Sequence, residues 1–450
     1  MMMGFPDFLN SKKEVCMKKF ISAFLICAMI LGIGILTGCE KVEPYQFKSG
    51  ELENYVIVYA NDNPDFFEFA NALSDRIYEK YGVMLSVMPD IIATPAEYEI
   101  VLGDTIHDNR HSKVMEYSVT VHDGKFKINV GGSFSAEKAV EFLCKNVFNG
   151  KELILDNGEY YKEHLMTKRY DVTDGTSARI MTANILADSF ADSSYQKAYY
   201  RAEIFAGMLV SSTPDIVGLQ EVDQNWNEVL DSYLTRIQNA YGITYSRCLA
   251  THQDKINYTS MLYRSDKFTP EGSGVNVFEW WEDSKFNHDY HMRNVSWAQF
   301  SSLEDTDENF IVANTHWSYR TEHANGSTYL AGSDKPIAEN ELREQCKNQT
   351  DVFLSELRQS HPETPIFMTG DFNTSLAVFT QSNWIPTDFR MISEEAKRSG
   401  KAEADVPETG HFDHLFGTGK YTINKFAYIK DINHIGLLTD HPFVYADFAF

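Results

Sequence analysis

Cysteine is scarce in this 450-residue chain, and its few positions follow no pattern that would bind a metal or form a disulfide framework. After Cys39 only Cys144, Cys248 and Cys346 remain, an odd number at irregular spacing. The chain also lacks HExxH, Walker and GxSxG sequences. The sequence therefore gives no support for a zinc protease, a nucleotide kinase or an α/β-hydrolase, because each depends on one of these motifs.

Basic residues are the second deficit. The chain has 40 Lys and Arg against 64 Asp and Glu, a formal net charge of −24. Residues 1–38 hold four of the lysines and two of the acidic residues, which leaves 36 basic and 62 acidic residues and a charge of −26. Nonspecific binding to DNA or RNA depends on Lys and Arg that neutralise phosphates. The balance therefore argues against a broad nucleic-acid surface, although a local basic patch is compatible with it.

An apolar run lies close to the N-terminus. Residues 17–39 begin with the basic Lys18 and Lys19, continue with apolar residues and end in Leu-Thr-Gly-Cys39. This arrangement resembles a bacterial lipoprotein signal. The resemblance implies a signal segment over residues 1–38, lipidation of Cys39, and a membrane-anchored protein facing the extracytoplasmic side. An uncleaved transmembrane anchor is the alternative, because the run approaches the ~20 residues that cross a bilayer.

The length and the 43% hydrophobic residues favour two globular domains after a tether at residues 39–50. The pattern of residues 51–165 predicts a small α+β domain, with buried strands at 55–59 and 98–102 and a hairpin that turns at Asp123-Gly124. Phe66, Ala70, Leu73 and Ile77 recur at helical spacing and predict one buried face of a helix. This unit faintly resembles accessory domains of some bacterial glycoside hydrolases; we favour a structural spacer over a carbohydrate-binding role. A polar linker is predicted over residues 161–177.

In the second unit, several predicted apolar strands begin or end at polar residues. Each such residue alone is typical of a loop or a helix cap, but together they indicate a site. Hard oxygen ligands suit Mg²⁺ or Mn²⁺, a carboxylate can orient and deprotonate water, and a histidine held by a carboxylate can exchange protons near neutral pH. The residues in question are Asn184, Glu221, His316, Asp371, Asn373, Asp413, Asp440 and His441.

Five short sequences resemble, in order and spacing, the endonuclease/exonuclease/phosphatase superfamily. They are Asp215-Ile-Val-Gly-Leu-Gln-Glu-Val222, Asn314-Thr-His316, Gly370-Asp-Phe-Asn373, Phe412-Asp-His-Leu-Phe416 and Thr439-Asp-His441. The resemblance covers residues 178–450. It implies a four-layer α/β sandwich, in which two packed mixed sheets are flanked by helices and the active site lies at one rim.

The resemblance also implies a role for each matching residue. Asn184 and Glu221 match the metal-binding pair, which Asp440 assists. Asp371 and Asn373 match the residues that place the nucleophile and the phosphate, Asp413 and His441 match the acid/base pair, and His316 matches the residue that stabilises the phosphate. Arg293 lies in a segment that sometimes supplies a phosphate contact.

Two departures from pancreatic-type deoxyribonucleases lower the expectation of an efficient duplex-DNA nuclease. Asn257-Tyr258-Thr259 stands where those enzymes support their equivalent of His316 with a glutamate, and Asp223 replaces an arginine. Trp317, with Trp280, Trp281 and Tyr290, is a candidate aromatic rim for a sugar or lipid head group, although burial in the core is the more common role of such residues.

These observations predict an extracytoplasmic hydrolase that uses Mg²⁺, with Mn²⁺ as an alternative, on a small or lipid-linked phosphodiester or phosphomonoester. A secreted nuclease acting on extracellular DNA or RNA is one alternative. A non-catalytic, glycan-binding lipoprotein is another.

Overall fold

The structure is a computed structural model. It describes residues 47–106, 112–122, 124–151, 154–155, 158–166, 168–191, 196–278, 293–305, 308–318, 320–322, 328–330, 341–382, 388–403, 411–429 and 432–450. Cys39, most of the predicted tether, and Trp280, Trp281 and Tyr290 lie outside these residues. Within them, no helix combines the length and the apolar character needed to cross a membrane.

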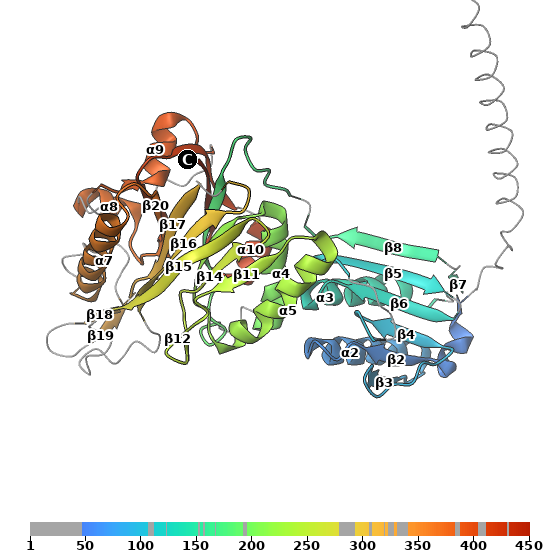
Figure 1. Ribbon diagram of the computed structural model, residues 1–450. Coiled ribbons are helices and arrows are strands. Elements are labelled where there is room, and N and C mark those ends of the chain that lie inside the picture. The colour runs from blue at the N-terminus through green and yellow to red at the C-terminus, as the bar shows by residue number, and fades with distance from the viewer. Residues whose placement is uncertain are drawn as a thin grey trace, which may run out of the picture.

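The N-terminal region contains one six-stranded sheet with the order β3-β2-β4-β6-β5-β8 (Figure 1). The four strands β3, β2, β4 and β6 are parallel, and β5 and β8 complete the sheet in antiparallel pairing. The bounds are β2 Val56–Tyr59, α2 Asp65–Tyr81, β3 Ser86–Pro89, β4 Glu99–Leu102, β5 Glu116–His122, β6 Lys125–Val130, α3 Ser133–Phe142 and β8 Gly158–His164.

Local predictions for this region are confirmed where the residue pattern is strong. The predicted apolar face Phe66, Ala70, Leu73 and Ile77 is buried on α2. The hairpin pairs His122 with Lys125, and the turn residue Gly124 has a φ of 81°, in the left-handed region that glycine adopts without strain.

Two predictions for this region are corrected by the structure. The expected α+β arrangement is an α/β one, because α2 connects the parallel strands β2 and β3 as a crossover. The predicted linker over residues 161–177 begins too early, since β8 continues to His164 and pairs with β5. The alternating polar residues of β8 match an edge strand with one solvent-exposed face.

The larger region contains two further six-stranded mixed sheets. The first has the order β11-β14-β10-β9-β24-β23 and the second has the order β15-β16-β17-β20-β22-β21. Strands of the first sheet are β9 Ala178–Asn184, β10 Ile216–Gln220, β11 Tyr245–Cys248, β14 Met261–Arg264, β23 Thr422–Ile429 and β24 Phe443–Ala449. Strands of the second are β15 Phe268–Val277, β16 Asn294–Ser302, β17 Asn309–His316, β20 Ile366–Asp371, β21 Arg390–Met391 and β22 Asp413–Thr418.

Successive side chains along a strand point to opposite faces of its sheet, so the core of this region has one layer between the two sheets and further layers under the helices. On β9, Ile180 faces the second sheet while Met181 faces helices α4 and α5. On β17, Val312 faces the first sheet while Ile311 faces helix α7. The helices are α4 Ala198–Ser212, α5 Gln224–Tyr241, α7 Glu341–Ser360, α8 Leu376–Ser382, α9 Ile392–Ser399 and α10 Ile432–Leu438. The prediction of an α/β protein with mixed sheets flanked by helices is confirmed.

Short elements complete the described residues. They are β1 Phe47–Lys48, η1 Ser49–Asn54, η2 Leu143–Val147, β7 Ile154–Leu155, β12 Thr251–His252, β13 Lys255–Ile256, β18 Arg320–Glu322 and β19 Thr328–Leu330.

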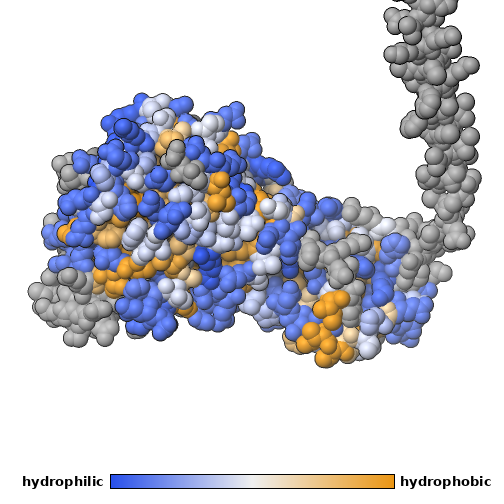
Figure 2. All heavy atoms as spheres, viewed as in Figure 1, coloured by the Kyte–Doolittle hydropathy of each residue, from blue (hydrophilic) through white to orange (hydrophobic). Residues whose placement is uncertain are grey.

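The two regions make direct contacts through α3, α4 and α5 (Figure 1). Away from these contacts, the N-terminal region exposes apolar side chains close to β3, and Figure 2 shows an orange surface on this region. Asp90 accepts hydrogen bonds from the backbone N–H groups of Asn61 and Ile106. Ile91, Ile92 and Ile106 are among the exposed apolar side chains of this region.

Candidate active site

Strand register explains why residues far apart in the sequence meet at one rim of the two sheets. Asn184, the last residue of β9, is paired with Gln220 at the end of β10, directly before Glu221. In the second sheet, His316 at the end of β17 is paired with Asp371 at the end of β20. Asp371 is in turn paired with Asp413 at the start of antiparallel β22.

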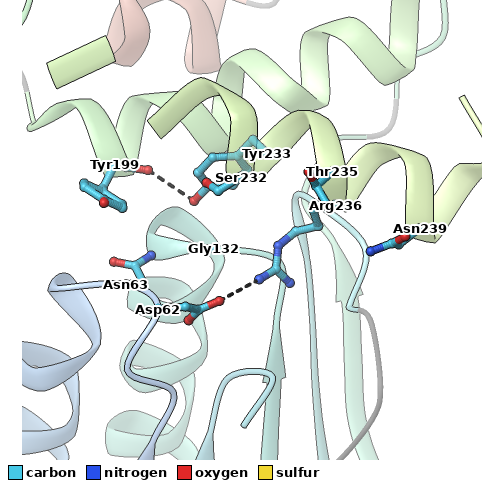
Figure 3. A pocket seen from close by; sticks show the side chains of 9 residues that line it. All are labelled: Asp62, Asn63, Gly132, Tyr199, Ser232, Tyr233, Thr235, Arg236 and Asn239. Atoms are coloured by element: carbon cyan, nitrogen blue, oxygen red, sulfur yellow. Dashed lines mark hydrogen bonds and ion pairs between the residues drawn. The ribbon is translucent and has the colours of Figure 1, made fainter. Parts of the chain in front are cut away.

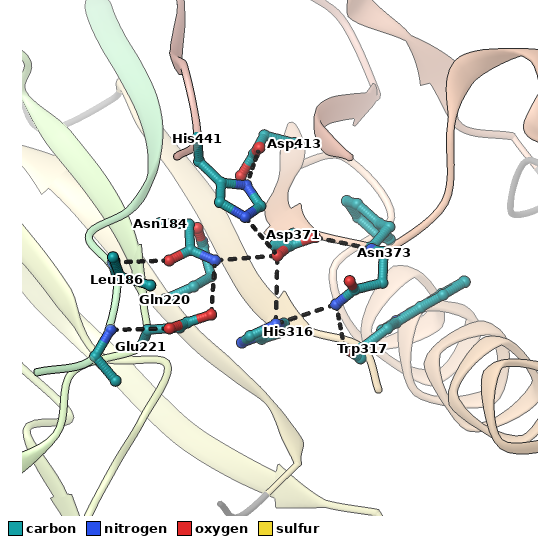
Figure 4. A network of polar contacts seen from close by, with 12 residues as sticks. Asn184, Leu186, Gln220, Glu221, His316, Trp317, Asp371, Asn373, Asp413 and His441 are labelled. Atoms are coloured by element: carbon teal, nitrogen blue, oxygen red, sulfur yellow. Dashed lines mark hydrogen bonds and ion pairs between the residues drawn. The ribbon is translucent and has the colours of Figure 1, made fainter. Parts of the chain in front are cut away.

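Glu221 and Asn184 form one side of the site (Figure 4). Glu221 has a φ of 69°, a left-handed conformation that is uncommon for a residue other than glycine. Its Oε2 accepts the backbone N–H of Ala187 at 2.8 Å, and its Oε1 accepts the Asn184 amide at 3.1 Å. Asn184 Oδ1 accepts the N–H of Leu186. A contact from that oxygen to a cation would therefore require the amide to turn over.

Asp371 lies at the centre of the cluster. Its Oδ2 accepts the Asn184 amide at 3.0 Å and lies 3.3 Å from His316 Nε2 and 3.8 Å from His441 Nε2. Its Oδ1 accepts the backbone N–H of Asn373 at 2.8 Å. The Asp371 side chain is 2% exposed, so these contacts take place away from bulk water.

His441 and Asp413 form a pair beside Asp371. His441 Nδ1 lies 2.7 Å from Asp413 Oδ2, so the carboxylate holds the imidazole and turns its Nε2 toward Asp371 (Figure 4). Thr439 orients this segment, because its hydroxyl donates to the carbonyl of Asn184 and accepts the N–H of His441. This geometry fits the expected acid/base pair.

Asn373 and His316 form the opposite side. The Asn373 amide donates to the carbonyl of Trp317 at 2.8 Å and lies 3.2 Å from His316 Nε2. Asn373 has a φ of 46°, a conformation that asparagine tolerates better than most residues. Arg293, whose expected role was a phosphate contact, is 1% exposed and donates to the carbonyl of His316.

The surroundings of the ionisable groups in the site shift their pKa values in different directions. Burial raises the pKa of Asp413 to about 6. Burial opposes ionisation of Asp371 and His441 as well, but their mutual attraction outweighs it. The pKa of Asp371 is therefore held well below its usual range by His441 and His316, and the pKa of His441 is raised well above its usual value by Asp413 and Asp371.

The donor set fits a divalent cation. Two groups of side chains, Glu221 with His316 and Asp371, and Asp371 with Asp413 and His441, each bring their ligand atoms within 4.8 Å of one another. Buried Asp413 Oδ1 and His316 Nδ1 have no hydrogen-bond partner among the described residues. Crowded carboxylates with remaining coordination capacity are typical of a cation site. Asp440 is 59% exposed and belongs to neither group.

The residues at the departure Asn257-Tyr258-Thr259, to which the sequence assigned no role, support the site. Tyr258 stacks on His316 with an interplanar angle of 8° and a centroid distance of 6.0 Å. Asn257, beside Tyr258, donates to the hydroxyl of Ser296 and accepts from the hydroxyl of Thr259. His316 is thus supported by an aromatic ring. The departure at Asn257-Tyr258-Thr259 was the available signal for it.

The side chains of Trp317 and Asp223 stabilise the fold and do not line the site. Trp317 is fully buried against Phe372 and Phe379, so a rim role for Trp317 is wrong and the core alternative is confirmed. Asp223 caps α5 by accepting the N–H of Trp226, which accounts for a carboxylate at this position.

Similar proteins were found among solved structures. An endonuclease/exonuclease/phosphatase from Bacteroides vulgatus has 21% identity and a TM-score of 0.45, over 60% of this chain and 98% of that chain. A mannosyl-6-phosphatase from Bacteroides thetaiotaomicron has 18% identity and a TM-score of 0.43, over 61% and 100%. TDP2 from D. rerio, in complex with single-stranded DNA product, has 17% identity and a TM-score of 0.41, over 61% and 99%.

No curated protein matches the chain. The family model described as "Endonuclease/Exonuclease/phosphatase family" matches residues 181–419, which include most of the candidate site and more than half of the chain. The chain belongs to the endonuclease/exonuclease/phosphatase family and is a hydrolase acting on phosphoester bonds.

Proposed function

We propose that this protein is an extracytoplasmic, Mg²⁺-dependent phosphoesterase that hydrolyses a small or lipid-linked phosphodiester or phosphomonoester. The observation that carries the proposal is the shared position of Asp371, which belongs to both groups of potential ligand atoms. Phosphoester hydrolysis needs a cation and proton-transfer groups around one phosphate, and this arrangement supplies both at one point.

The proposed catalytic roles follow from the contacts. Glu221 and Asp371 hold the cation, with Asn184 through its oxygen after the amide turns over. When bound, Mg²⁺ or Mn²⁺ neutralises the charge that develops on the phosphoryl group. Asp371 orients the attacking water and accepts its proton, and His441, held by Asp413, exchanges a proton through Nε2.

The opposite side of the site binds the phosphate. Asn373 and His316 face the cluster from the second sheet, and both side chains can donate hydrogen bonds to nonbridging oxygens. We include Asp440 as an outer residue that acts on the cation through water, because its exposed carboxylate lies beside His441.

Charge favours a small substrate over duplex DNA. The net charge is −24, and Asp223 stands where pancreatic-type nucleases carry an arginine. A secreted nuclease is the alternative. Turnover of an aryl phosphodiester and nicking of plasmid DNA should be compared with and without EDTA. We expect EDTA-sensitive aryl turnover to exceed nicking, and predominant nicking would favour the nuclease.

A non-catalytic, glycan-binding lipoprotein is the second alternative. It predicts that the combined substitution Asp371→Asn and His441→Ala leaves any measured hydrolysis unchanged. The phosphoesterase proposal predicts that this variant loses hydrolysis while its thermal melting temperature is retained.

The extracytoplasmic location rests on the signal-like residues 17–39. Lipidation of Cys39 would leave eight residues before Phe47, a reach of at most about 29 Å, so the N-terminal region would lie near the membrane. Labelling with a radioactive fatty acid tests this location, and the expected incorporation should disappear in Cys39→Ala.

A further inference from the structure

A cavity lies between the N-terminal region and the α4–α5 face of the larger region (Figure 3). Its volume is about 290 Å³, and it shares no residue with the catalytic cluster. The N-terminal region contributes Asp62, Asn63 and Gly132 to its walls, and helices α4 and α5 contribute Tyr199, Ser232, Tyr233, Thr235, Arg236 and Asn239.

The position of the cavity follows from the strand topology. Asp62 and Asn63 lie in the loop after β2, and Gly132 follows β6. Both segments therefore leave the carboxyl ends of parallel strands. The chain places β3 on one side of β2 and β4 on the other, so the strand order reverses at β2. Crevices at the carboxyl ends of strands beside such a reversal are common ligand sites in α/β proteins.

The walls are held together by buried contacts between the regions. Glu203 of α4 accepts the backbone N–H of Met115 at 2.8 Å and of Ser135 at 2.9 Å. Gly132 permits the close approach, because a Cβ there would lie 2.2 Å from the Tyr233 hydroxyl oxygen. Tyr200 of α4 also donates to Glu137 at 2.6 Å. The cavity is thus a formed feature of the fold.

Its charges argue against an anionic ligand. Arg236 is the cationic residue among those that line the cavity. It already pairs with Asp104 at 2.5 Å and lies 3.6 Å from Asp62. The N-terminus of α3, which would otherwise attract an anion, has the Glu203 carboxylate on the N–H of Ser135. A phosphate here would meet more negative than positive charge.

The remaining polar groups combine donors with acceptors. The hydroxyls of Ser232 and Thr235 donate to carbonyls of their own helix and keep lone pairs for a ligand. The Asp62 carboxylate accepts, while the Asn239 amide both donates and accepts. Tyr199, half-buried, presents an aromatic ring on the side of Asn63 (Figure 3). An anion would need donors alone and a cation acceptors alone, whereas hydroxyl groups satisfy both.

We propose that this cavity binds a neutral, hydroxyl-rich ligand the size of one pyranose ring. Pockets for larger molecules begin at roughly 300 Å³, so a volume of about 290 Å³ suits a single ring. The site is separate from the catalytic cluster, so its ligand need not be the phosphoester substrate.

The test uses the full-length chain in a zwitterionic detergent, because a sugar-based detergent would compete. Saturation-transfer difference NMR is recorded with glucose, galactose, mannose and N-acetylglucosamine. We expect saturable binding of at least one sugar, with the signal lost in Tyr199→Ala and Asn239→Leu. Gln238→Leu is the matched control, since Gln238 is an exposed neighbour on α5 outside the cavity lining.

Three outcomes would overturn the proposal: no sugar binds, binding is equal in Asn239→Leu and Gln238→Leu, or inorganic phosphate displaces the sugar. Asn239 is exposed, so Asn239→Leu is expected to fold, and an unchanged melting temperature checks this. The readout does not use hydrolysis. Failure of sugar binding is therefore distinguishable from failure of the proposed phosphoesterase activity.

Discussion

Buried carboxylates at the interface between the two regions and at the sheet rim differ in the partners they have. Glu203, between the two regions, accepts two backbone N–H groups that are fixed by the fold. At the sheet rim, Glu221, Asp371 and Asp413 lie close together with His316 and His441 among them. A carboxylate with neutral, fixed donors stabilises an interface, whereas crowded carboxylates need positively charged partners such as a protonated histidine or a metal ion. The first arrangement is structural and the second is suited to chemistry.

The largest effect on kcat is expected for a substitution of Asp371, at the sheet rim. Asp371→Asn removes the carboxylate shared by both ligand groups, so we expect kcat for an aryl phosphodiester to fall by about 10³-fold, within the range for loss of a proton-transfer group. The melting temperature should fall only modestly, because asparagine keeps an acceptor oxygen for the N–H of Asn373 while the attraction of the carboxylate to His441 and His316 is lost. A large fall in melting temperature would instead make Asp371 a structural residue.

Glu203→Ala is expected to lower the stability of the protein and to leave its kcat unchanged, the reverse of Asp371→Asn. It leaves the N–H groups of Met115 and Ser135 buried without their acceptor. Each loss costs about 1–3 kcal/mol, so the free energy of unfolding should fall by about 2–6 kcal/mol. The kcat of the folded protein should be unchanged. Glu203→Gln, which keeps one acceptor oxygen, should lose less. Urea unfolding and steady-state kinetics give the two readouts, and a selective loss of kcat would contradict the structural role.

Loss of the Tyr258 ring, which supports His316, is expected to have an intermediate effect on kcat. Tyr258→Leu removes the stacked ring, so we expect kcat to fall by about 10-fold to 100-fold, the range for a displaced catalytic group. Tyr258→Phe keeps the ring and should retain most of the activity. Equal losses in both variants would show that the hydroxyl, and not stacking, is what matters.

The smallest expected effect is at Asp440. Its exposed carboxylate lies 3.9 Å from His441 Nε2 and outside both ligand groups. Asp440→Asn should therefore change kcat and the Mg²⁺ concentration at half-maximal rate only slightly, as seen in Mg²⁺ titrations of the rate. A loss comparable with that of Glu221→Gln would make Asp440 a direct ligand.

Much of the fold and of the candidate site could be predicted because both depend on local pattern. Short apolar runs identify β17 and β20, whose two faces are both buried. The helical spacing of Ala198, Ala202, Phe205 and Leu209 identifies α4, and Pro214 accounts for its end. Strand-end residues can be expected to meet because parallel strands end at a common edge. The family resemblance added the order in which His316, Asp371 and His441 occur along the chain.

Other features depend on partners distant in the sequence. Nothing around Glu203 indicates that it accepts hydrogen bonds from residues 115 and 135, since these groups meet only when the two regions pack. The same holds for the stacking of Tyr258 on His316 and for the cavity at Arg236. The C-terminal part of the edge strand β8 was predicted as linker, because its polar residues give a weak strand pattern.

The central claim is that the rim cluster must bind a divalent cation for hydrolysis. The most direct measurement is a titration of Mg²⁺ into metal-free protein while aryl phosphodiester hydrolysis is followed, for the wild type and for Glu221→Gln. We expect no turnover without metal, a saturable rise in the wild type, and a titration of Glu221→Gln shifted to much higher Mg²⁺. Turnover without metal, or coincident titrations of the two proteins, would contradict the claim.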